Sequence, residues 1–186
     1  MLYTTFGKLS KKRNCKAVVE VLEKSLGHPT AYGRDTLIFF PEVVRICGVE
    51  AALDALRTAD GGQTPEAVKV KRRFAHRCVL ETPLLDGGYV VDLCVSPQLK
   101  AAAVDFDVAS FGAWQSVDAL LGGVGVEAHS SLADRSCIAF FQQQAIFSTI
   151  LAVEAAVEHA GQSAPEAYLV AMKAQEELFV DVLGGF

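Results

Sequence analysis

Four acidic side chains lie on a stretch of the chain whose composition is typical of short β-strands. They are Glu81, Asp92, Asp105 and Asp107. Successive side chains of a strand point to opposite faces, so Asp105 and Asp107 would share one face. Together with Asp92 they would offer three carboxylates to a divalent cation. We interpret the acids as strand-edge residues that keep the sheet soluble; the alternative is a metal-dependent nuclease.

The segment that carries these acids also resembles a known class of fold. Asp86–Asp92 followed by Ala103–Asp105 resembles restriction-endonuclease-like folds and the RAP module that closes some organellar RNA-binding helical-repeat proteins. The resemblance implies nuclease chemistry at the acids. The chain departs from the pattern after the second acid, because Asp107 and Val108 stand where a lysine is expected and no Gly-Pro-His follows.

A run of cations precedes the acidic stretch. Lys69–Arg77 holds five lysines and arginines in nine residues, with Phe74 among them, and a second cluster lies near the start of the chain. Cations that neutralise phosphates and a ring that stacks on a base are the groups that bind RNA. The candidate nucleic-acid-binding residues are Lys69, Lys71, Arg72, Arg73, Phe74, Arg77, Lys11, Lys12 and Arg13. Two alternatives are that the run pairs with an acidic protein neighbour or forms a solvated helix face.

The whole chain divides in charge after this run. Fourteen of its 17 lysines and arginines lie from Lys8 to Arg77 against eight acids, a net charge of +6. From Cys78 onward three cations oppose 14 acids, a net charge of −11. Clustered cations raise the local concentration of anions, and the acidic part repels them. We therefore expect a basic helical part, residues 1–77, and an acidic part, residues 78–186, within one compact unit.

Other signatures of catalysis are missing from the sequence. Gly123–Ala128 has the spacing of a dinucleotide fingerprint, but that motif needs a preceding strand, and Trp114–Leu121 is predicted to be a helix. No P-loop, nucleophile elbow or HExxH is present. His76 and Cys78 have no further ligands nearby to complete a tetrahedral metal site. We expect no cofactor and no enzymatic activity.

The cysteines and the first residues bear on the compartment. The five cysteines are odd in number and include no CxxC, which indicates reduced thiols inside a cell. Met1–Asn14 is basic and free of acids, like a mitochondrial targeting segment. We expect an uncleaved basic arm that packs on the protein, in the mitochondrion or otherwise in the cytoplasm.

An uncharged stretch, Ser136–Val153, has 18 residues, the lower bound for a helix that spans a membrane. It contains three consecutive glutamines, Gln142–Gln144. Neighbouring helix positions point about 100° apart, so at least one amide would face lipid. The stretch therefore predicts a buried helix and no membrane span.

Local signals predict a mostly α protein with a small antiparallel β patch (α+β). Short helices are expected over residues 15–26, 41–47 and 49–58, with another opened by Pro65. Two or three central strands are expected over residues 78–80, 89–95 and 102–106, although residues 98–104 compete as a helix. The aromatic residues Phe106, Phe111 and Trp114 are expected to join the strands to the helices.

The last third predicts a long αα-hairpin. Ser131 and Asp134 begin one helix that continues to Ala160, and Ser163–Glu166 forms a capping box for a second that ends at Gly184. Because only Gly161–Ser163 separates them, the two helices should pack antiparallel.

These features together predict a non-catalytic structural subunit of a larger intracellular assembly, such as a ribonucleoprotein. The basic part would contact RNA or an acidic protein, and the hairpin would dock on other protein subunits. A second hypothesis is a homo-oligomer of the coat or filament type, in which the basic part of one copy meets the acidic part of the next. The third hypothesis is the nuclease that uses Asp92, Asp105 and Asp107.

Overall fold

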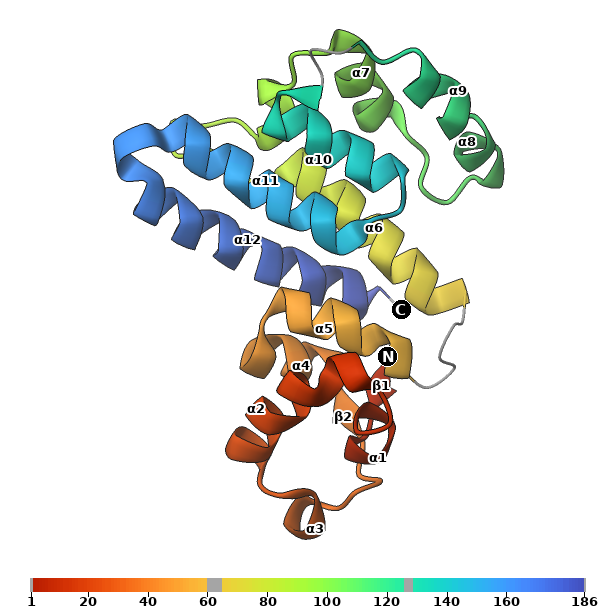
Figure 1. Ribbon diagram of the computed structural model, residues 1–186, viewed down its shortest axis with the longest axis vertical. Helices are drawn as coiled ribbons and strands as arrows, with labels where there is room; N and C mark the ends of the chain where they lie inside the picture. The colour runs from red at the N-terminus through yellow and green to blue at the C-terminus, as the bar shows by residue number, and fades with distance from the viewer. Residues whose placement is uncertain (1, 60–64, 126–128, 186) are drawn as a thin grey trace. The chain divides into compact units, whose positions relative to one another are not determined.

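The structure, a computed structural model, describes residues 2–59, 65–125 and 129–185 and consists mainly of helices (Figure 1). The chain forms two compact units. Unit 1 comprises residues 1–71 and 179–186, and unit 2 comprises residues 72–178. Helices α6 (Pro65–Glu81) and α12 (Ala164–Gly184) contribute residues to both units. The division expected at Cys78 therefore falls inside α6, which continues past it to Glu81.

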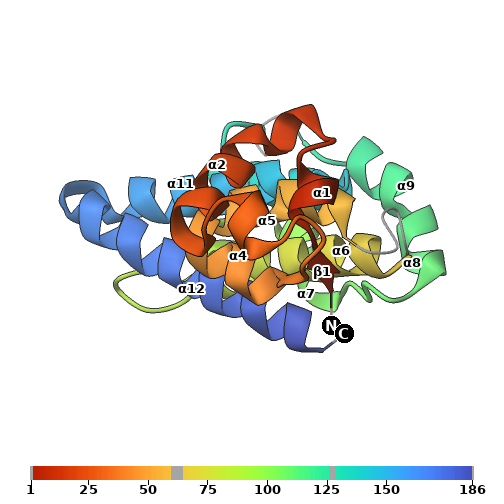
Figure 2. The same cartoon turned by 90° about the horizontal axis from the view of Figure 1, so that it is seen from below.

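Unit 1 packs short helices beside a two-stranded sheet. Strands β1 (Tyr3–Thr4) and β2 (Ile38–Phe39) pair antiparallel, with Tyr3 opposite Phe39. The helical elements are α1 (Phe6–Leu9), η1 (Arg13–Cys15), α2 (Lys16–Leu26), α3 (Pro29–Tyr32), α4 (Phe40–Cys47), α5 (Val49–Ala55) and η2 (Leu56–Thr58). Helices α2, α4 and α5 contact one another (Figure 2), and each buries at least one apolar side chain completely, Leu22, Val43 and Leu53 respectively. The helices expected over residues 15–26, 41–47 and 49–58 are confirmed within a residue or two.

Unit 2 is built around two neighbouring helices, α10 (Leu132–Phe141) and α11 (Ala145–Ala160), which lie side by side (Figure 1). Their backbones approach closely at two small residues. The Ser136 hydroxyl donates to the Ser148 carbonyl at 2.8 Å, and the Ser148 hydroxyl donates to the Ser136 carbonyl at 3.0 Å. The remaining elements are η3 (Val90–Leu93), α7 (Pro97–Asp105), α8 (Phe111–Gln115), α9 (Val117–Gly122) and η5 (Gly161–Ser163).

The fold class is confirmed, but the β patch does not lie where composition predicted it. Residues 78–80 belong to α6, residues 89–95 contain η3, and residues 102–105 belong to α7. Within the described part of this region, the β pairing is a single isolated bridge between Pro83 and Tyr89. Cys78 and Val79 are fully buried on α6. Strand propensity reflects how well a side chain packs on a half-buried surface, and a helix can also provide such a surface. In this region most of the half-buried side chains lie on helices. The helix that competed for residues 98–104 is confirmed.

The long helix expected from Ser131 to Ala160 is interrupted at Gln142–Gln144. Ser131 caps α10 as predicted, since its hydroxyl accepts the Asp134 N–H at 3.3 Å. Helix α10 then ends in a Schellman motif: Gln143 has φ +60°, its N–H donates to Phe140 O, and the Gln144 N–H donates to Ala139 O, both at 2.8 Å. The three glutamines are exposed at a turn between two helices. No helix among the described residues is long and apolar enough to cross a membrane.

The C-terminal αα-hairpin is confirmed for α11 and the unit 2 part of α12. Figure 1 shows the two helices running alongside each other. Ala171 packs with Ala152 and Ala156 in one apolar cluster. The buried Gln175 side chain donates to Thr149 O at 3.0 Å and to the Thr82 hydroxyl at 3.3 Å. Small residues and a satisfied amide therefore allow close packing of these helices.

Aromatic side chains fill the centre of unit 2. The ring centroids of Phe106 and Trp114 lie 4.8 Å apart, and Phe106 also contacts Phe140 and Phe141. The expected joining role therefore holds for Phe106 and Trp114, although they join helices to helices. It does not hold for Phe111, whose side chain is 77% exposed.

Candidate functional site

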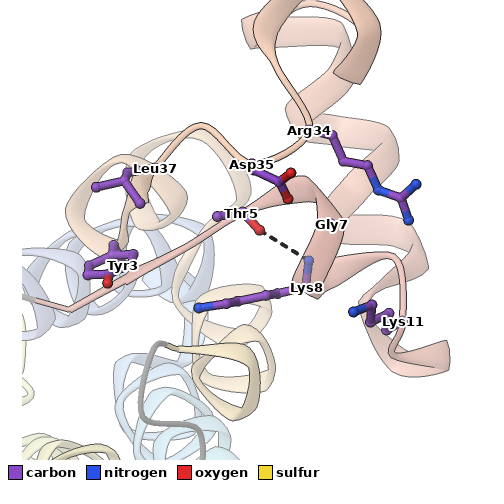
Figure 3. A pocket seen from close by; sticks show the side chains of 8 residues that line it. All are labelled: Tyr3, Thr5, Gly7, Lys8, Lys11, Arg34, Asp35 and Leu37. Carbon is purple, nitrogen blue, oxygen red and sulfur yellow. Dashed lines mark hydrogen bonds between the residues drawn. The ribbon is translucent and has the colours of Figure 1, made fainter.

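A pocket of about 570 Å³ opens on unit 1 near the start of the chain (Figure 3). It is formed by β1, α1 and the turn between α3 and β2. The lining residues are Tyr3, Thr5, Gly7, Lys8, Lys11, Arg34, Asp35 and Leu37. Three of them are cations and one is an acid, so the pocket carries a positive charge.

The turn and α1 are held together through Gly7. The Gly7 N–H donates to Arg34 O at 2.9 Å. A Cβ at residue 7 would lie 3.0 Å from Asp35 Oδ1 and 3.3 Å from Arg34 Cγ, so these two side chains would have to shift by a few tenths of an ångström. The Thr5 hydroxyl caps α1 by accepting the Lys8 N–H at 3.2 Å, which places Lys8 in the first turn of the helix. The local backbone thus sets Lys8 and Arg34 around one opening.

A glycine also shapes the turn that presents Arg34. Gly33 has φ +102°, and a Cβ there would collide with Thr36 Oγ1. The Thr36 N–H closes the turn onto Gly33 O at 3.1 Å, and its hydroxyl donates to Tyr32 O at 3.0 Å. The Tyr32 ring packs edge-on against Phe6 of α1 at 5.8 Å. Arg34 and Asp35 therefore project from a tightly fixed turn.

One side of the pocket is aromatic. Figure 3 shows the Lys8 side chain running back along β1 toward Tyr3, and Lys8 Nζ lies 5.4 Å from the centroid of that ring. The Tyr3 ring packs edge-on against Phe39 at 6.4 Å. Phe39 and Leu37 are both exposed. The pocket therefore combines cations with apolar and aromatic surface.

Further cations lie beside the pocket. Lys12 and Arg13 are exposed and follow Lys11 directly in the chain, and Lys16, three residues after Arg13, is also exposed. Among the described residues, no carboxylate forms an ion pair with Lys11, Lys12, Arg13 or Arg34. Their charges are therefore available to an external anion. Of the predicted residues, Lys11 lines the pocket, and Lys12 and Arg13 are exposed just after it in the chain.

Tyr3, Arg34 and Asp35 line the pocket, and sequence reasoning misses all three. Arg34 stands alone in the sequence, with no basic neighbour and an acid next to it. Only the contact of its turn with Gly7 brings it near Lys8. The one signal in the sequence is the Gly33-Arg-Asp turn, which indicates a tight turn but not its neighbour.

In the second predicted nucleic-acid-binding cluster, Lys69–Arg77, two arginines bind other side chains of the protein. Arg72 donates through Nε and Nη2 to Gln143 Oε1 at 3.2 and 2.7 Å, and its guanidinium lies 4.4 Å from the centre of the Trp114 ring. Arg77 donates through both Nε and Nη2 to the Glu81 carboxylate at 2.8 Å. These two arginines thus bind groups within unit 2.

Phe74 lies in the interior with none of its side chain exposed, so its ring is not available to stack on a base. Lys69 and Arg73 are exposed on α6, and Lys71 is half-buried. Of the two clusters expected to bind nucleic acid, the one in unit 1 therefore offers the more accessible combination of cations and aromatic rings.

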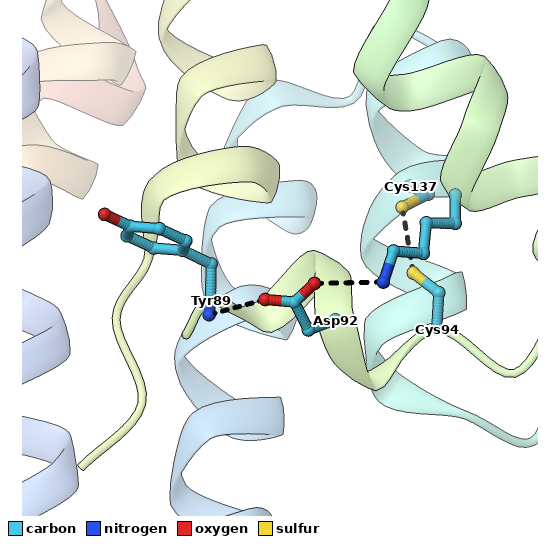
Figure 4. A network of polar contacts seen from close by, with 5 residues as sticks. Tyr89, Asp92, Cys94 and Cys137 are labelled. Atoms are coloured by element: carbon cyan, nitrogen blue, oxygen red, sulfur yellow. Dashed lines mark hydrogen bonds and ion pairs between the residues drawn. The ribbon is translucent and has the colours of Figure 1, made fainter. Parts of the chain in front are cut away.

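The acids expected to bind a cation are separated by the helices. Asp92 accepts the Tyr89 N–H at 3.0 Å and the Lys100 ammonium at 2.9 Å (Figure 4). The hydrogen bond from Lys100, followed by that from Tyr89, lowers the pKa of Asp92. Asp105 is exposed at the end of α7, and Asp107 accepts the Ala109 N–H at 3.0 Å in the following turn.

The shared strand face that suggested a metal therefore does not exist. In the portion of the chain that the structure describes, no three His, Cys, Asp or Glu side chains are placed to hold a metal ion. The interpretation of Asp92, Asp105 and Asp107 as a metal site is corrected accordingly, because α7 replaces the expected strand.

His76 is part of the interior of unit 2. Its ring is stacked on Phe140 at 5.0 Å, and its Nε2 lies 2.7 Å from Ala103 O. Burial lowers the pKa of His76, against smaller opposing effects of the Ala103 carbonyl and the Glu81 charge. This histidine therefore packs as a neutral ring.

No protein-family model, curated protein or solved structure matches this chain.

Proposed function

We propose that the protein is a non-catalytic subunit of a larger assembly and that unit 1 binds single-stranded RNA through the basic pocket. The observation that carries the proposal is the convergence of Lys8, Lys11 and Arg34 around an opening that also contains the Tyr3 ring. Phosphate binding by cations supplies most of the affinity for nucleic acid, and aromatic rings supply stacking for unpaired bases.

Each group of the pocket has a role in this proposal. Lys8 and Lys11 neutralise phosphates as point charges, and the planar Arg34 guanidinium binds two phosphate oxygens at once. Tyr3 in the pocket and the exposed Phe39 that packs against it outside the pocket lining offer ring surface to a base. Asp35 accepts a hydrogen bond from a ribose hydroxyl or a base amino group, which are donors that a plain phosphate lacks.

An acidic protein segment is the competing partner. The aromatic side of the pocket favours RNA, because a carboxylate-rich peptide needs cations but no stacking surface. Lys12, Arg13 and Lys16 extend the charge beyond the pocket in a direction that a phosphate backbone could follow.

Two observations support a structural rather than an enzymatic role. Asp92, the best placed of the predicted metal ligands, is bound to Lys100 and to the Tyr89 backbone. In the hairpin, Tyr168 and Leu169 expose 50% and 68% of their surface, which suits docking on another subunit.

Fluorescence anisotropy with a labelled single-stranded RNA of about ten nucleotides tests the proposal. Each phosphate contact on a single strand contributes about −0.7 to the slope of log K against log salt, so three contacts predict a slope of about −2. Raising salt from about 50 to about 200 mM should then weaken binding about 20-fold. The double variant Lys8→Gln/Arg34→Gln should reduce this loss to about threefold.

Lys24→Gln is the matched control, because Lys24 is an exposed lysine of unit 1 outside the pocket. It should change the affinity less than the pocket variants do. Absence of binding at the lowest salt, or an equal effect of Lys24→Gln, would reject the pocket as an RNA site. If a polyglutamate peptide displaced the RNA completely at equal charge concentration, the partner would instead be an acidic protein.

A further inference from the structure

Two of the five cysteines meet in unit 2. The sulfur atoms of Cys94 and Cys137 lie 3.5 Å apart, although the residues are separated by 43 positions in the sequence (Figure 4). Cys94 directly follows η3, and Cys137 lies in α10. Both are free thiols.

A buried carboxylate holds the two backbones in this arrangement. Asp134 lies one helical turn before Cys137, and its side chain is completely buried. It accepts the Val95 N–H at 2.8 Å and the Ser96 N–H at 3.1 Å, so it fastens the residues that follow Cys94 to α10. The Cys94 N–H is itself bound to Val91 O at 3.3 Å. The backbone that follows Cys94 is therefore held against α10 next to Cys137.

The two thiols differ in access to solvent. Cys137 is fully buried in the aromatic core of unit 2, whereas Cys94 is half-buried at its edge. The hydrogen bond with Cys94, and then burial, raise the pKa of Cys137. Because the thiolate is the reactive form, Cys137 does not react first, and an external reagent meets Cys94.

We propose that Cys94 and Cys137 form a reversible intramolecular disulfide by exchange with a small disulfide such as glutathione disulfide. The Cys94 thiolate attacks one sulfur of the reagent, which forms a mixed disulfide and releases one glutathione thiolate. Cys137 then attacks Cys94 Sγ and gives its proton to the glutathione thiolate released in the first step; the protein disulfide forms, and the second glutathione leaves as a thiolate that takes up a proton from water. Two protein thiols are oxidised, and one glutathione disulfide is reduced to two thiols.

To form the bond, the sulfurs must approach from 3.5 Å to the bonding distance of about 2.05 Å. The bond would tie the residues that follow η3 covalently to α10, where Asp134 already ties them by hydrogen bonds. It would thus make unit 2 sensitive to the redox state of its surroundings, independently of RNA binding in unit 1.

The test is to equilibrate the full chain with glutathione disulfide and to map the products by mass spectrometry. The unmodified protein should lose two hydrogens and yield a single cross-linked peptide pair, Cys94 with Cys137. Cys137→Ser should instead retain one glutathione on Cys94, because the second step is blocked. Cys94→Ser should show neither product at these positions.

Cys47→Ser is the matched control. Cys47 is also half-buried, but its thiol donates to the Val18 carbonyl at 3.9 Å, and burial raises its pKa to about 11. This variant should form the Cys94–Cys137 bond as the unmodified protein does. A protein that keeps all five thiols under these conditions, or a disulfide that maps to another pair, would overturn the proposal.

Discussion

Replacing Asp134 with alanine should destabilise unit 2 strongly, although this residue is one of 22 acids and lies in the most acidic part of the chain. Its carboxylate is fully buried and accepts two backbone N–H groups, those of Val95 and Ser96. Asp134 also lies in the first turn of α10, where a negative charge favours the helix. Alanine would leave both N–H groups without an acceptor.

The magnitude follows from these contacts. A hydrogen bond to a charged group contributes about 1.5 to 3 kcal/mol, so the pair contributes roughly 3 to 6 kcal/mol. The helix terminus adds about 0.5 kcal/mol, and relief of carboxylate burial offsets part of the sum. We expect Asp134→Ala to lower the free energy of unfolding by about 3 to 5 kcal/mol, and Asp134→Asn by about half as much, because one carbonyl oxygen is kept.

Urea unfolding followed by circular dichroism measures the global effect, and hydrogen exchange measures the local one. The Val95 and Ser96 amides should exchange much faster in Asp134→Ala than in the unmodified protein. Asp105→Ala is the control, since Asp105 is exposed and should change stability by no more than about 0.5 kcal/mol. Suppose that the free energy of unfolding of Asp134→Ala lay within about 0.5 kcal/mol of that of the unmodified protein and that both amides stayed protected. The Asp134 carboxylate would then not hold the backbone at Val95 and Ser96.

Two further predictions concern α6 of unit 2. Arg72→Ala should lower the free energy of unfolding by about 1 to 2 kcal/mol, because it removes the hydrogen bonds to Gln143 and the guanidinium over the Trp114 ring. The fluorescence of Trp114, the single tryptophan, should shift in this variant, and Arg72→Lys should restore little of the stability or of the spectrum. An unchanged spectrum in Arg72→Ala would contradict the contact between Arg72 and Trp114. The pKa of His76 is lowered in the folded state, so as the pH falls the His76 ring binds a proton first in the unfolded state. The contribution of neutral His76 to the free energy of unfolding is therefore complete above about pH 6.5. It is lost as the pH falls through the pKa of the unfolded state and then through that of the folded state. The urea midpoint should fall less between about pH 7.5 and about pH 5.5 in His76→Gln than in the unmodified protein. Protonation of Asp92, whose pKa is also lowered, reduces stability in a separate pH range, below the ordinary pKa of 3.8.

The sequence by itself determined the features that depend on near neighbours along the chain. Ser131 caps α10 because a hydroxyl accepts a backbone N–H three residues away. Pro41 stands in the first turn of α4, and Pro65 begins α6. The short link between α11 and α12 required them to lie antiparallel. These signals made the helical class and the hairpin predictable, and they brought Lys11, Lys12 and Arg13 into one candidate surface.

Tertiary structure alone decided how the side chains are used. Phe74 and Arg72 belong to the same basic run, yet one is buried and the other is bound to Trp114 and Gln143. Nothing near them in the sequence indicates this, because the partners of Arg72 lie 42 and 71 residues away. Strand-like composition misplaced the β patch for the same reason, since burial and not propensity set the local structure.

The two sites that carry the proposals show this division most clearly. Arg34 lies at the basic pocket because its turn contacts α1, through the hydrogen bond from the Gly7 N–H and the packing of Tyr32 on Phe6. Cys94 and Cys137 meet where the buried Asp134 carboxylate binds the backbone that follows Cys94. Local sequence directs the backbone through contacts of a few residues, whereas burial and charge pairing depend on which distant segments pack together, and that is a property of the folded chain.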